Sequence, residues 1–214
     1  MPEPMVWRLL QLADGAFPAG GFAHSGGLEA AVQLGEAGDI ERLVTCALWQ
    51  SACVALPFVR RAHAAADVEA VAAVDAAADV FLLGHVANRA SRAQGRALAT
   101  SAGRAFSSVV PLAEAVASGR LGGHFAPVLG ATAAAVGLGA EDTEVLALHV
   151  GARGVLSAAV RLGRIGPFEA QALQARLPFE AARRAIPEEP VQTAPLLEIY
   201  GSLHDRLYSR LFQS

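Results

Sequence analysis

The segment of residues 14–29 holds the densest group of residues that could do chemistry. It reads DGAFPAGGFAHSGGLE and contains five glycines and one proline. Glycine permits positive φ angles and close backbone approach, as loops that hold phosphate groups require. Gly15 and Gly20 have the separation of a phosphate-binding loop, but Gly21 and Phe22 stand where that loop needs Lys followed by Ser or Thr. The sequence therefore excludes a nucleotide-binding loop of this type.

Ser25 offers a second kind of chemistry. It lies in the sequence Ala-His-Ser-Gly-Gly, which resembles an alanine variant of the nucleophile elbow of hydrolases. Asp142 with His149 or His204 could complete a triad, since triads are defined by geometry and not by spacing. The elbow requires a strand directly before the serine, whereas prolines and glycines precede Ser25. A serine hydrolase with Ser25 as nucleophile is the less favoured alternative.

The histidines and cysteines give no sign of a metal centre. The six histidines are scattered, with no pair at the spacing of three or four residues that places two ligands on one helical turn. Cys46 and Cys53 are about 10.5 Å apart along one predicted helix, whereas a disulfide needs Cα atoms within about 7 Å. Two unpaired thiols are typical of a reducing compartment. We assign no metal ligand, no stably bound cofactor and a cytoplasmic location.

Composition narrows the class of protein further. All 17 basic residues are arginines, so lysine nucleophiles and Schiff-base chemistry are excluded. The net charge of −3 lacks the basic excess of proteins that bind nucleic acids or anionic membranes. Hydrophobic residues make up 53% and charged residues 17%, which predicts a folded domain. Other proteins or small molecules are the expected partners.

The longest uncharged stretch spans residues 121–140. Its length alone would make it a candidate membrane span. His124, Pro127 and several glycines interrupt it, and its hydrophobicity is modest. We predict a buried central helix at this place and no membrane segment.

Helices must position all of these residues. Alanine is the commonest residue and no segment alternates apolar with polar residues, which favours helix throughout. Asp39 is predicted to cap a helix that continues to Leu56 and stops at Pro57, and Asp79 to cap a long helix to about Ala105. Further helices are expected over 57–65, 111–117, the uncharged segment after Gly123 and 141–162, with two short ones after Pro167 and Pro178. The prediction is an all-α, single-domain helical bundle of about eight to ten helices.

Three arginines project from one face of the predicted long helix. Arg89, Arg92 and Arg96 have i, i+3, i+7 spacing, so they can face solvent, carboxylates or a partner's phosphate groups. Small residues recur behind them at helical spacing, at Gly84, Ser91 and Gly95. Such residues let another helix approach closely.

The C-terminal part of the sequence differs from the rest. Residues 186–195 carry three prolines and two adjacent glutamates, which predicts a linker over the surface. Residues 203–214, LHDRLYSRLFQS, combine apolar and aromatic side chains with two arginines. Exposed side chains of this kind favour docking into a partner's groove, whereas packing back onto the same chain is the alternative that spacing leaves open. We expect this tail to lie outside the core.

Several separated segments together resemble the UreF family of urease accessory proteins. The most specific is similar to the family pattern P-x-G-G-F-x-x-S-x-G-L-E and comprises Pro18, Gly20, Gly21, Phe22, Ser25, Gly27, Leu28 and Glu29. Residues 89–98, 124–130, 157–162, 166–167 and 208–214 resemble further family stretches in the same order. Phe17 and Gly15 depart from the pattern, which has an aliphatic residue and Ser there. Together the matches span nearly the whole chain.

The resemblance implies a helical homodimer that binds two copies of the accessory protein UreD, also called UreH. The complex would recruit the GTPase UreG and then act on apo-urease. The UreF protein in this scheme is a scaffold without an active site that regulates the GTPase, while the partner complex handles nickel and GTP. A helical regulatory module unrelated to nickel is the third class that the sequence leaves open.

The resemblance also indicates where partners bind. By analogy with the family, residues 1–185 form the helical domain and residues 186–214 the linker and partner-docking tail. The predicted partner-binding residues are Gly20, Gly21, Phe22, Ser25, Glu29, Arg92, Arg96, Tyr208, Arg210 and Phe212. The three tail residues are expected to dock UreD, and the N-terminal group to form the dimer or GTPase surface. As a hypothesis, Arg92 or Arg96 acts as an arginine finger that neutralises charge on the transferring phosphoryl group.

Overall fold

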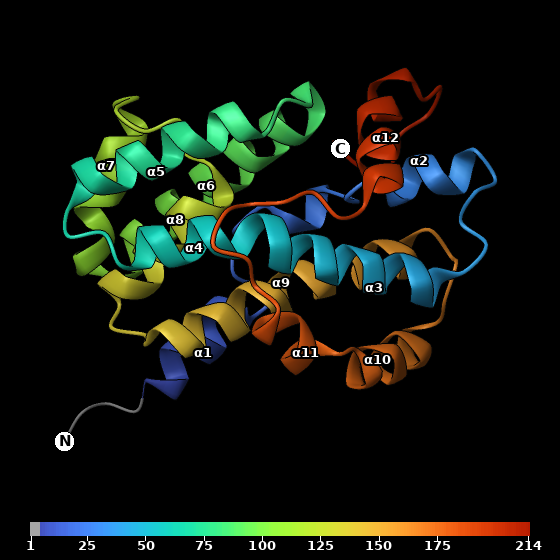
Figure 1. Ribbon diagram of the computed structural model, residues 1–214, viewed down its shortest axis with the longest axis horizontal. Coiled ribbons are helices and arrows are strands. Elements are labelled where there is room, and N and C mark those ends of the chain that lie inside the picture. Colours follow the sequence, from blue (N-terminus) through green and yellow to red (C-terminus); the bar gives the residue numbers. More distant parts are fainter. Residues whose placement is uncertain (1–4) are drawn as a thin grey trace.

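All regular elements in the described part of the protein are helices. A computed structural model describes residues 5–214, and within them no strand occurs (Figure 1). The α-helices are α1 Val6–Ala13, α2 Leu28–Gln33, α3 Ile40–Gln50, α4 Leu56–His63, α5 Val68–Phe81, α6 His85–Ala105, α7 Val110–Ala117, α8 Phe125–Ala135, α9 Ala140–Arg161, α10 Pro167–Arg176, α11 Phe179–Arg184 and α12 Pro195–Leu203. Short 3₁₀ turns cover Gly21–Ala23, Ser107–Val109 and His204–Arg206. The prediction of an all-α single-domain bundle is confirmed.

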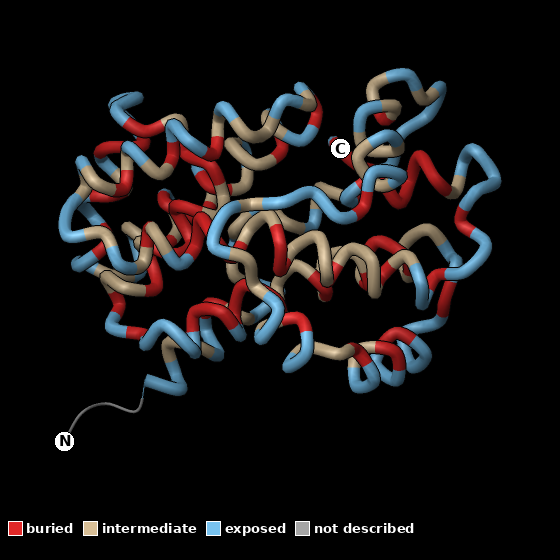
Figure 2. The backbone as a smooth tube through the Cα atoms, in the orientation of Figure 1, coloured by how far each residue is buried: buried red, intermediate tan, exposed pale blue. Residues whose placement is uncertain are grey.

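The core lies between α9 and the helices that surround it. Helix α9 contacts α1, α2, α3, α4, α8, α10 and α11, and α8 packs between α4 and α6. Buried residues follow the inner sides of these helices in Figure 2. Alanines are frequent among them, and small side chains allow helix axes to approach closely. The uncharged segment after Gly123 forms the mostly buried helix α8, as predicted.

Asp39 caps α3 as predicted, because its carboxylate accepts a hydrogen bond from the N–H of Arg42 at 2.9 Å. The predicted stop at Pro57 is wrong. A π-helical turn over Ser51–Ala55 joins α3 to α4 without a break. Proline has no N–H to give to the carbonyl group of Cys53 one turn earlier. The N–H of Val191 donates to that carbonyl at 2.9 Å instead, so the linker satisfies the group that the proline leaves unpaired.

The predicted role of Asp79 as a helix cap is also wrong. Asp79 lies inside α5, which Asp67 caps by accepting from the N–H of Ala70 at 2.8 Å. The chain turns between α5 and α6, and α6 ends at Ala105 as predicted. The Asp79 carboxylate instead accepts a hydrogen bond from the Asn88 side chain at 2.8 Å and contacts the side chains of Arg92 and His124. Its carboxylate therefore joins α5 to α6.

Two helical runs are long and apolar enough, by length and composition alone, to cross a membrane. They are Ile40–His63 and Ala140–Arg161. In the most apolar stretch of each run, 44% of the first and 50% of the second is buried inside the structure. The two runs pack against each other. They are core helices of this bundle, and core helices commonly have the length and apolar composition of a membrane span.

Candidate partner-binding surface

The glycine-rich segment before α2 lies against α12, which comes from the other end of the chain (Figure 1). Gly27 has a φ of +89°, which favours glycine. A Cβ atom at this position would lie 2.9 Å from the carbonyl oxygen of Leu197 and 3.0 Å from the nitrogen of Gly201. The backbone of α12 therefore packs directly on the start of α2, and only glycine fits there.

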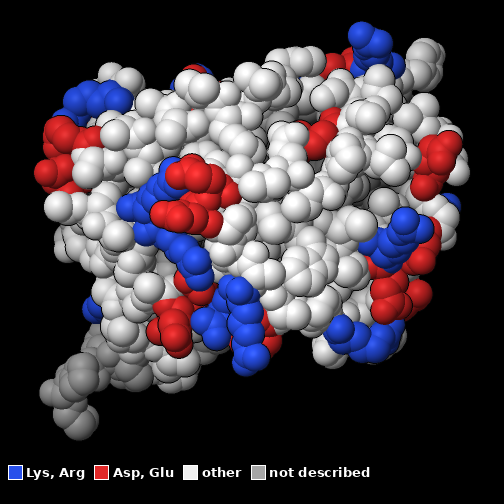
Figure 3. Space-filling model, in the orientation of Figure 1, with Lys and Arg blue, Asp and Glu red and all other residues white. Residues whose placement is uncertain are grey.

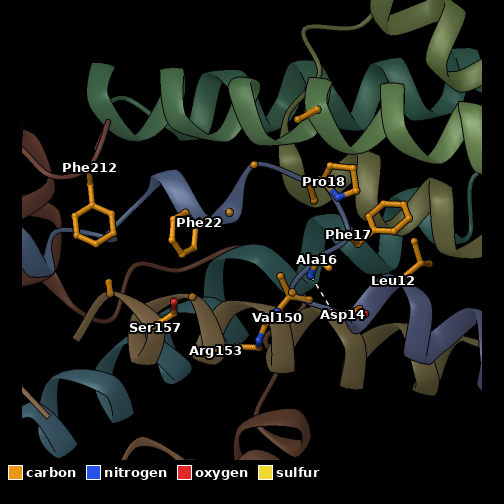
Figure 4. A pocket seen from close by; sticks show the side chains of 17 residues that line it. Leu12, Asp14, Ala16, Phe17, Pro18, Phe22, Val150, Arg153, Ser157 and Phe212 are labelled. Carbon is orange, nitrogen blue, oxygen red and sulfur yellow. Dashed lines mark hydrogen bonds between the residues drawn. The ribbon is translucent and has the colours of Figure 1, made fainter. Parts of the chain in front are cut away.

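An open cavity of about 390 Å³ lies between the glycine-rich segment and α9. In Figure 4, Val150, Arg153 and Ser157 line it from α9, with Phe22 and Phe212 at one end. Gly20 and Gly21 also line it. The wall is mainly apolar, so this cavity is a place where an apolar side chain of another protein fits.

Arg161 joins the glycine-rich segment to the tail. Its guanidinium lies 3.7 Å from the ring centroid of Phe22 and 4.2 Å from that of Phe212. It also donates a hydrogen bond to the carbonyl oxygen of Phe22. The Phe22 side chain is 68% exposed, whereas Phe212 is buried in the core. Cation–π contacts of this kind hold the two rings in place.

Ser25 and Glu29 face inward toward the tail. The hydroxyl of Ser25 donates to the carbonyl oxygen of Ser214 at 3.0 Å. The carboxylate of Glu29 accepts from the backbone N–H groups of Leu211 and Phe212 and contacts the ring of His204. All of these groups except Leu211 are buried. The expectation that the tail lies outside the core is therefore wrong, because Phe212 is part of the core.

Two large apolar side chains of the tail remain exposed. Tyr208 is fully exposed and Leu211 is 54% exposed. Arg210 forms an exposed pair with Asp205 at 3.3 Å, and Asp205 also accepts two hydrogen bonds from Arg89. The Arg89 guanidinium, together with His85, lowers the pKa of the Asp205 carboxyl group. The outer side of the tail thus presents an aromatic and an aliphatic side chain beside a small ionic cluster.

The arginines of α6 have different surroundings. Arg92 pairs with Asp79, and hydrogen bonds from Asn88, Arg92 and His124 lower the pKa of that carboxyl group. Arg96 is exposed and donates to the carbonyl oxygen of Gly122 at 3.2 Å. Arg92 thus takes part in internal packing, whereas the guanidinium of Arg96 is open to a partner.

His24 has its pKa lowered by burial and by the nearby positive groups of His204 and Arg89. Its Nδ1 atom lies 2.6 Å from the hydroxyl of Ser214. Within residues 5–214 no three His, Cys, Asp or Glu side chains come together in a group that could hold a metal ion. No strand precedes Ser25 in the described chain, and its hydroxyl is enclosed, so the hydrolase interpretation is wrong.

The structure brings Phe22, Ser25, Glu29 and Phe212 together from the two ends of the chain, with only Phe22 exposed. Sequence reasoning missed three residues of this surface, Arg161, His204 and Asp205, which connect its segments. Each has a partner more than a hundred residues away in the sequence, which no local pattern marks.

Comparison with known proteins places these features in context. The UreF family profile matches residues 34–178. Urease accessory protein F of Arabidopsis thaliana is 35% identical over 224 residues, which cover 98% of this chain and 93% of that protein. Urease accessory protein F of Oryza sativa subsp. indica is 34% identical over 226 residues, covering 99% and 86%. Urease accessory protein UreF of Mycobacterium sp. (strain JLS) is 33% identical over 212 residues, covering 96% and 97%.

Proposed function

Because the chain belongs to the UreF family of urease accessory proteins, we propose that it is the scaffold of a complex with UreD, also called UreH, and the GTPase UreG. The proteins of this family are non-catalytic helpers of urease maturation. In the proposed complex, GTP hydrolysis by UreG is coupled to insertion of nickel into apo-urease. The chain positions these partners as a homodimer and binds neither nickel nor GTP stably itself.

The observation that carries the proposal is the exposed apolar surface at the tail. Tyr208 and Leu211 project from a backbone that is hydrogen-bonded to α2, and Phe22 is exposed nearby on the glycine-rich segment. Aromatic side chains are enriched where proteins bind each other. Much of the surface over α5 is also uncharged in the view of Figure 3. Broad uncharged surfaces support a role in assembly.

The test of the scaffold is capture of partners from co-expression. The chain is co-expressed with UreD and UreG, and the mass of the captured complex is measured with and without residues 203–214. Because Phe212 and His204 belong to the core, a double variant, Tyr208→Ala with Leu211→Ala, tests the tail without removing buried groups. Phe168→Ala, which removes another exposed aromatic side chain on α10, is the control.

We expect both partners to be captured by the intact chain and by Phe168→Ala, and UreD to be lost from the double variant. Capture of neither partner by the intact chain, with both partners folded, would replace the scaffold by a helical regulatory module unrelated to nickel.

Regulation of the GTPase is assigned to the exposed side of α6 and to the glycine-rich segment, at Gly20, Gly21 and Phe22. Arg96 is the arginine we propose for charge neutralisation, since Arg92 is paired with Asp79. Arg96→Ala is expected to slow GTP turnover in the assembled complex. An unchanged turnover rate would leave the chain a positioning scaffold only.

We also propose a cytoplasmic location, in which the free thiols of Cys46 and Cys53 stay reduced. Cell fractionation with detection of the chain in the membrane or exported fraction would contradict it.

A further inference from the structure

The cavity between the glycine-rich segment and α9 contains an arginine without a carboxylate partner. Arg153 lines this cavity of about 390 Å³ from α9. Its Nη1 atom donates one long hydrogen bond, of 3.5 Å, to the carbonyl oxygen of Ala13. Within residues 5–214 the guanidinium forms no ion pair with Asp or Glu. Because a guanidinium is always charged and carries several N–H donors, most of its binding capacity is available to a ligand.

The guanidinium of Arg153 lies directly against the backbone of Gly15. A Cβ atom on Gly15 would lie 1.5 Å from Nη2 of Arg153 and 2.5 Å from its Cζ atom. Any other residue at position 15 would therefore push the guanidinium out of this place. Gly15 is also one of the two positions at which the segment departs from the UreF pattern, and the other, Phe17, lines the same cavity. Both departures of this chain from the family pattern thus meet at one site.

Helix α9 supplies a second donor on the same face. Arg153, Ser157 and Arg161 recur at every fourth position, so they lie above one another on the helix. Arg153 and Ser157 both line the cavity in Figure 4, and the Ser157 hydroxyl has no hydrogen-bond partner among the described residues. The Arg161 guanidinium lies over the ring of Phe22 at one end of the cavity and adds a positive charge nearby.

The rest of the wall is mainly apolar. Leu12, Phe17 and Val150 line it together with glycine and alanine residues. Asp14 is the other charged residue at the cavity, but its Oδ1 atom accepts from the N–H of Ala16 at 2.9 Å, and it forms no ion pair with Arg153. A charge beside apolar walls is poorly hydrated unless an opposite charge pairs with it. The cavity therefore suits a molecule that joins one anionic group to an apolar body.

The number of charges selects the type of anion. A guanidinium pairs in two-pronged geometry with either a carboxylate or a phosphate group. A phosphate group carries up to two negative charges, whereas only Arg153 among the lining residues is positive and Asp14 adds a negative charge. A carboxylate brings a single negative charge and is neutralised by one guanidinium.

We propose that this cavity binds a small monocarboxylate with an aromatic or branched aliphatic body. The carboxylate pairs with Arg153 and accepts from the hydroxyl of Ser157, while the apolar body lies against Val150 and Phe17. The site does not depend on the proposed scaffold function. An acidic residue of a partner protein could present the same chemical group, so the test separates a free acid from a partner.

The test is titration of the isolated full-length chain with benzoate, followed by calorimetry and by amide chemical shifts. Benzamide, which has the same shape without the charge, is the control ligand. We expect benzoate to bind at about millimolar concentration or below, and benzamide at least about tenfold more weakly. The amides of residues 15–22 and 153–157 should shift with benzoate.

Arg153→Met removes the charge and keeps an unbranched side chain. Arg164→Met is the matched control, because Arg164 also donates a single hydrogen bond of 3.5 Å to a backbone carbonyl, that of Ala37, and forms no ion pair among the described residues. We expect at least about tenfold weaker benzoate binding for Arg153→Met, unchanged benzamide binding, and the affinity of the intact chain for Arg164→Met.

Gly15→Ala tests the site without removing the arginine. The added methyl group displaces only the flexible end of Arg153, so we expect weaker benzoate binding with little change in thermal unfolding. Gly38→Ala is its control, since a Cβ atom on Gly38 meets nothing within 4 Å. Asp14→Asn should tighten benzoate binding, because it removes the like charge from the cavity.

Equal binding of benzoate and benzamide would overturn the proposal, as would unchanged benzoate affinity in both Arg153→Met and Gly15→Ala. Repeating the titration on the captured complex with UreD and UreG separates the two sources of the carboxylate. The same affinity as in the isolated chain supports a free acid, whereas loss of benzoate binding would assign the cavity to a partner's side chain. Failure of the scaffold proposal would leave the titration of the isolated chain unaffected.

Discussion

Two buried carboxylates in this protein hold a distant backbone segment in the same way, but with different consequences. Asp75 on α5 accepts from the N–H groups of Gly122 and Gly123, at 2.7 and 3.2 Å, and from that of His124 at 2.7 Å. Glu29 on α2 accepts from two N–H groups of the tail. The loop held by Asp75 leads directly into the core helix α8, whereas the tail held by Glu29 exposes Tyr208.

The difference indicates what each attachment does. Residues 122–124 are enclosed between helices, so their order is inseparable from the core. In the tail only His204, Phe212 and Ser214 are buried, and exposed side chains separate them, so the tail can loosen while the rest stays folded. Loss of Asp75 should therefore affect the whole molecule, and loss of Glu29 mainly the tail.

Removal of Asp75 is expected to have the largest effect. Asp75→Ala leaves three backbone N–H groups without their acceptor, which costs on the order of 4 kcal/mol in the free energy of unfolding. Urea denaturation followed by circular dichroism measures it. A loss below about 1 kcal/mol would mean that the loop finds other acceptors or water.

Gly95→Ala tests how tightly the same region is packed. A Cβ atom on Gly95 would lie 2.1 Å from the carbonyl oxygen of Gly123, so α6 must move, at a cost of about 2–3 kcal/mol. Gly154→Ala on α9 is the control, since a Cβ atom there meets nothing within 4 Å. That change is expected to stabilise the protein by about 0.5–1 kcal/mol. Equal effects of the two variants in thermal unfolding would contradict the packing argument.

At the tail, Arg161→Ala is expected to cost about 1–2 kcal/mol, because it removes contacts with both the Phe22 and the Phe212 rings. Faster exchange of the tail amides should accompany the loss, with core amides little changed. Arg161→Lys keeps the charge but not the planar group and should recover only part of the stability. Full recovery by lysine would show that charge alone matters.

The smallest expected effect concerns pH. Burial lowers the pKa of both His24 and His149. As the pH falls below about 6.5, the unfolded chain takes up protons on these side chains before the folded chain does, so the free energy of unfolding decreases. The pKa values of Asp79 and Asp205 are also lowered in the folded chain. Protonation of these carboxyl groups in the unfolded chain therefore lowers the free energy of unfolding further, but only once the pH falls to the ordinary pKa of Asp, 3.8. His24→Gln should flatten the dependence between about pH 7 and pH 5 in urea denaturation, and an unchanged slope would exclude His24 as a contributor.

Several features follow from local sequence patterns. The all-α class, the cap at Asp39, the buried helix α8 and the end of α6 at Ala105 are each encoded by neighbouring residues. The predicted helix end at Pro57 was wrong, because a helix can continue through a proline when another N–H group donates to the carbonyl group that the proline leaves unpaired. Here the donor is Val191, far away in the sequence.

The helical class follows from composition and periodicity, and the resemblance to the UreF family follows from motifs that keep their order along the chain. Tertiary structure alone decided that Ser25, Glu29 and Phe212 face inward while Phe22 and Tyr208 face outward. Glu29 and Leu211 are separated by 182 positions in the chain, and helical periodicity describes only neighbours within a few turns. The choice of acceptor for a buried N–H group is made when distant segments pack together, which is why the tail's attachment point was visible only in three dimensions.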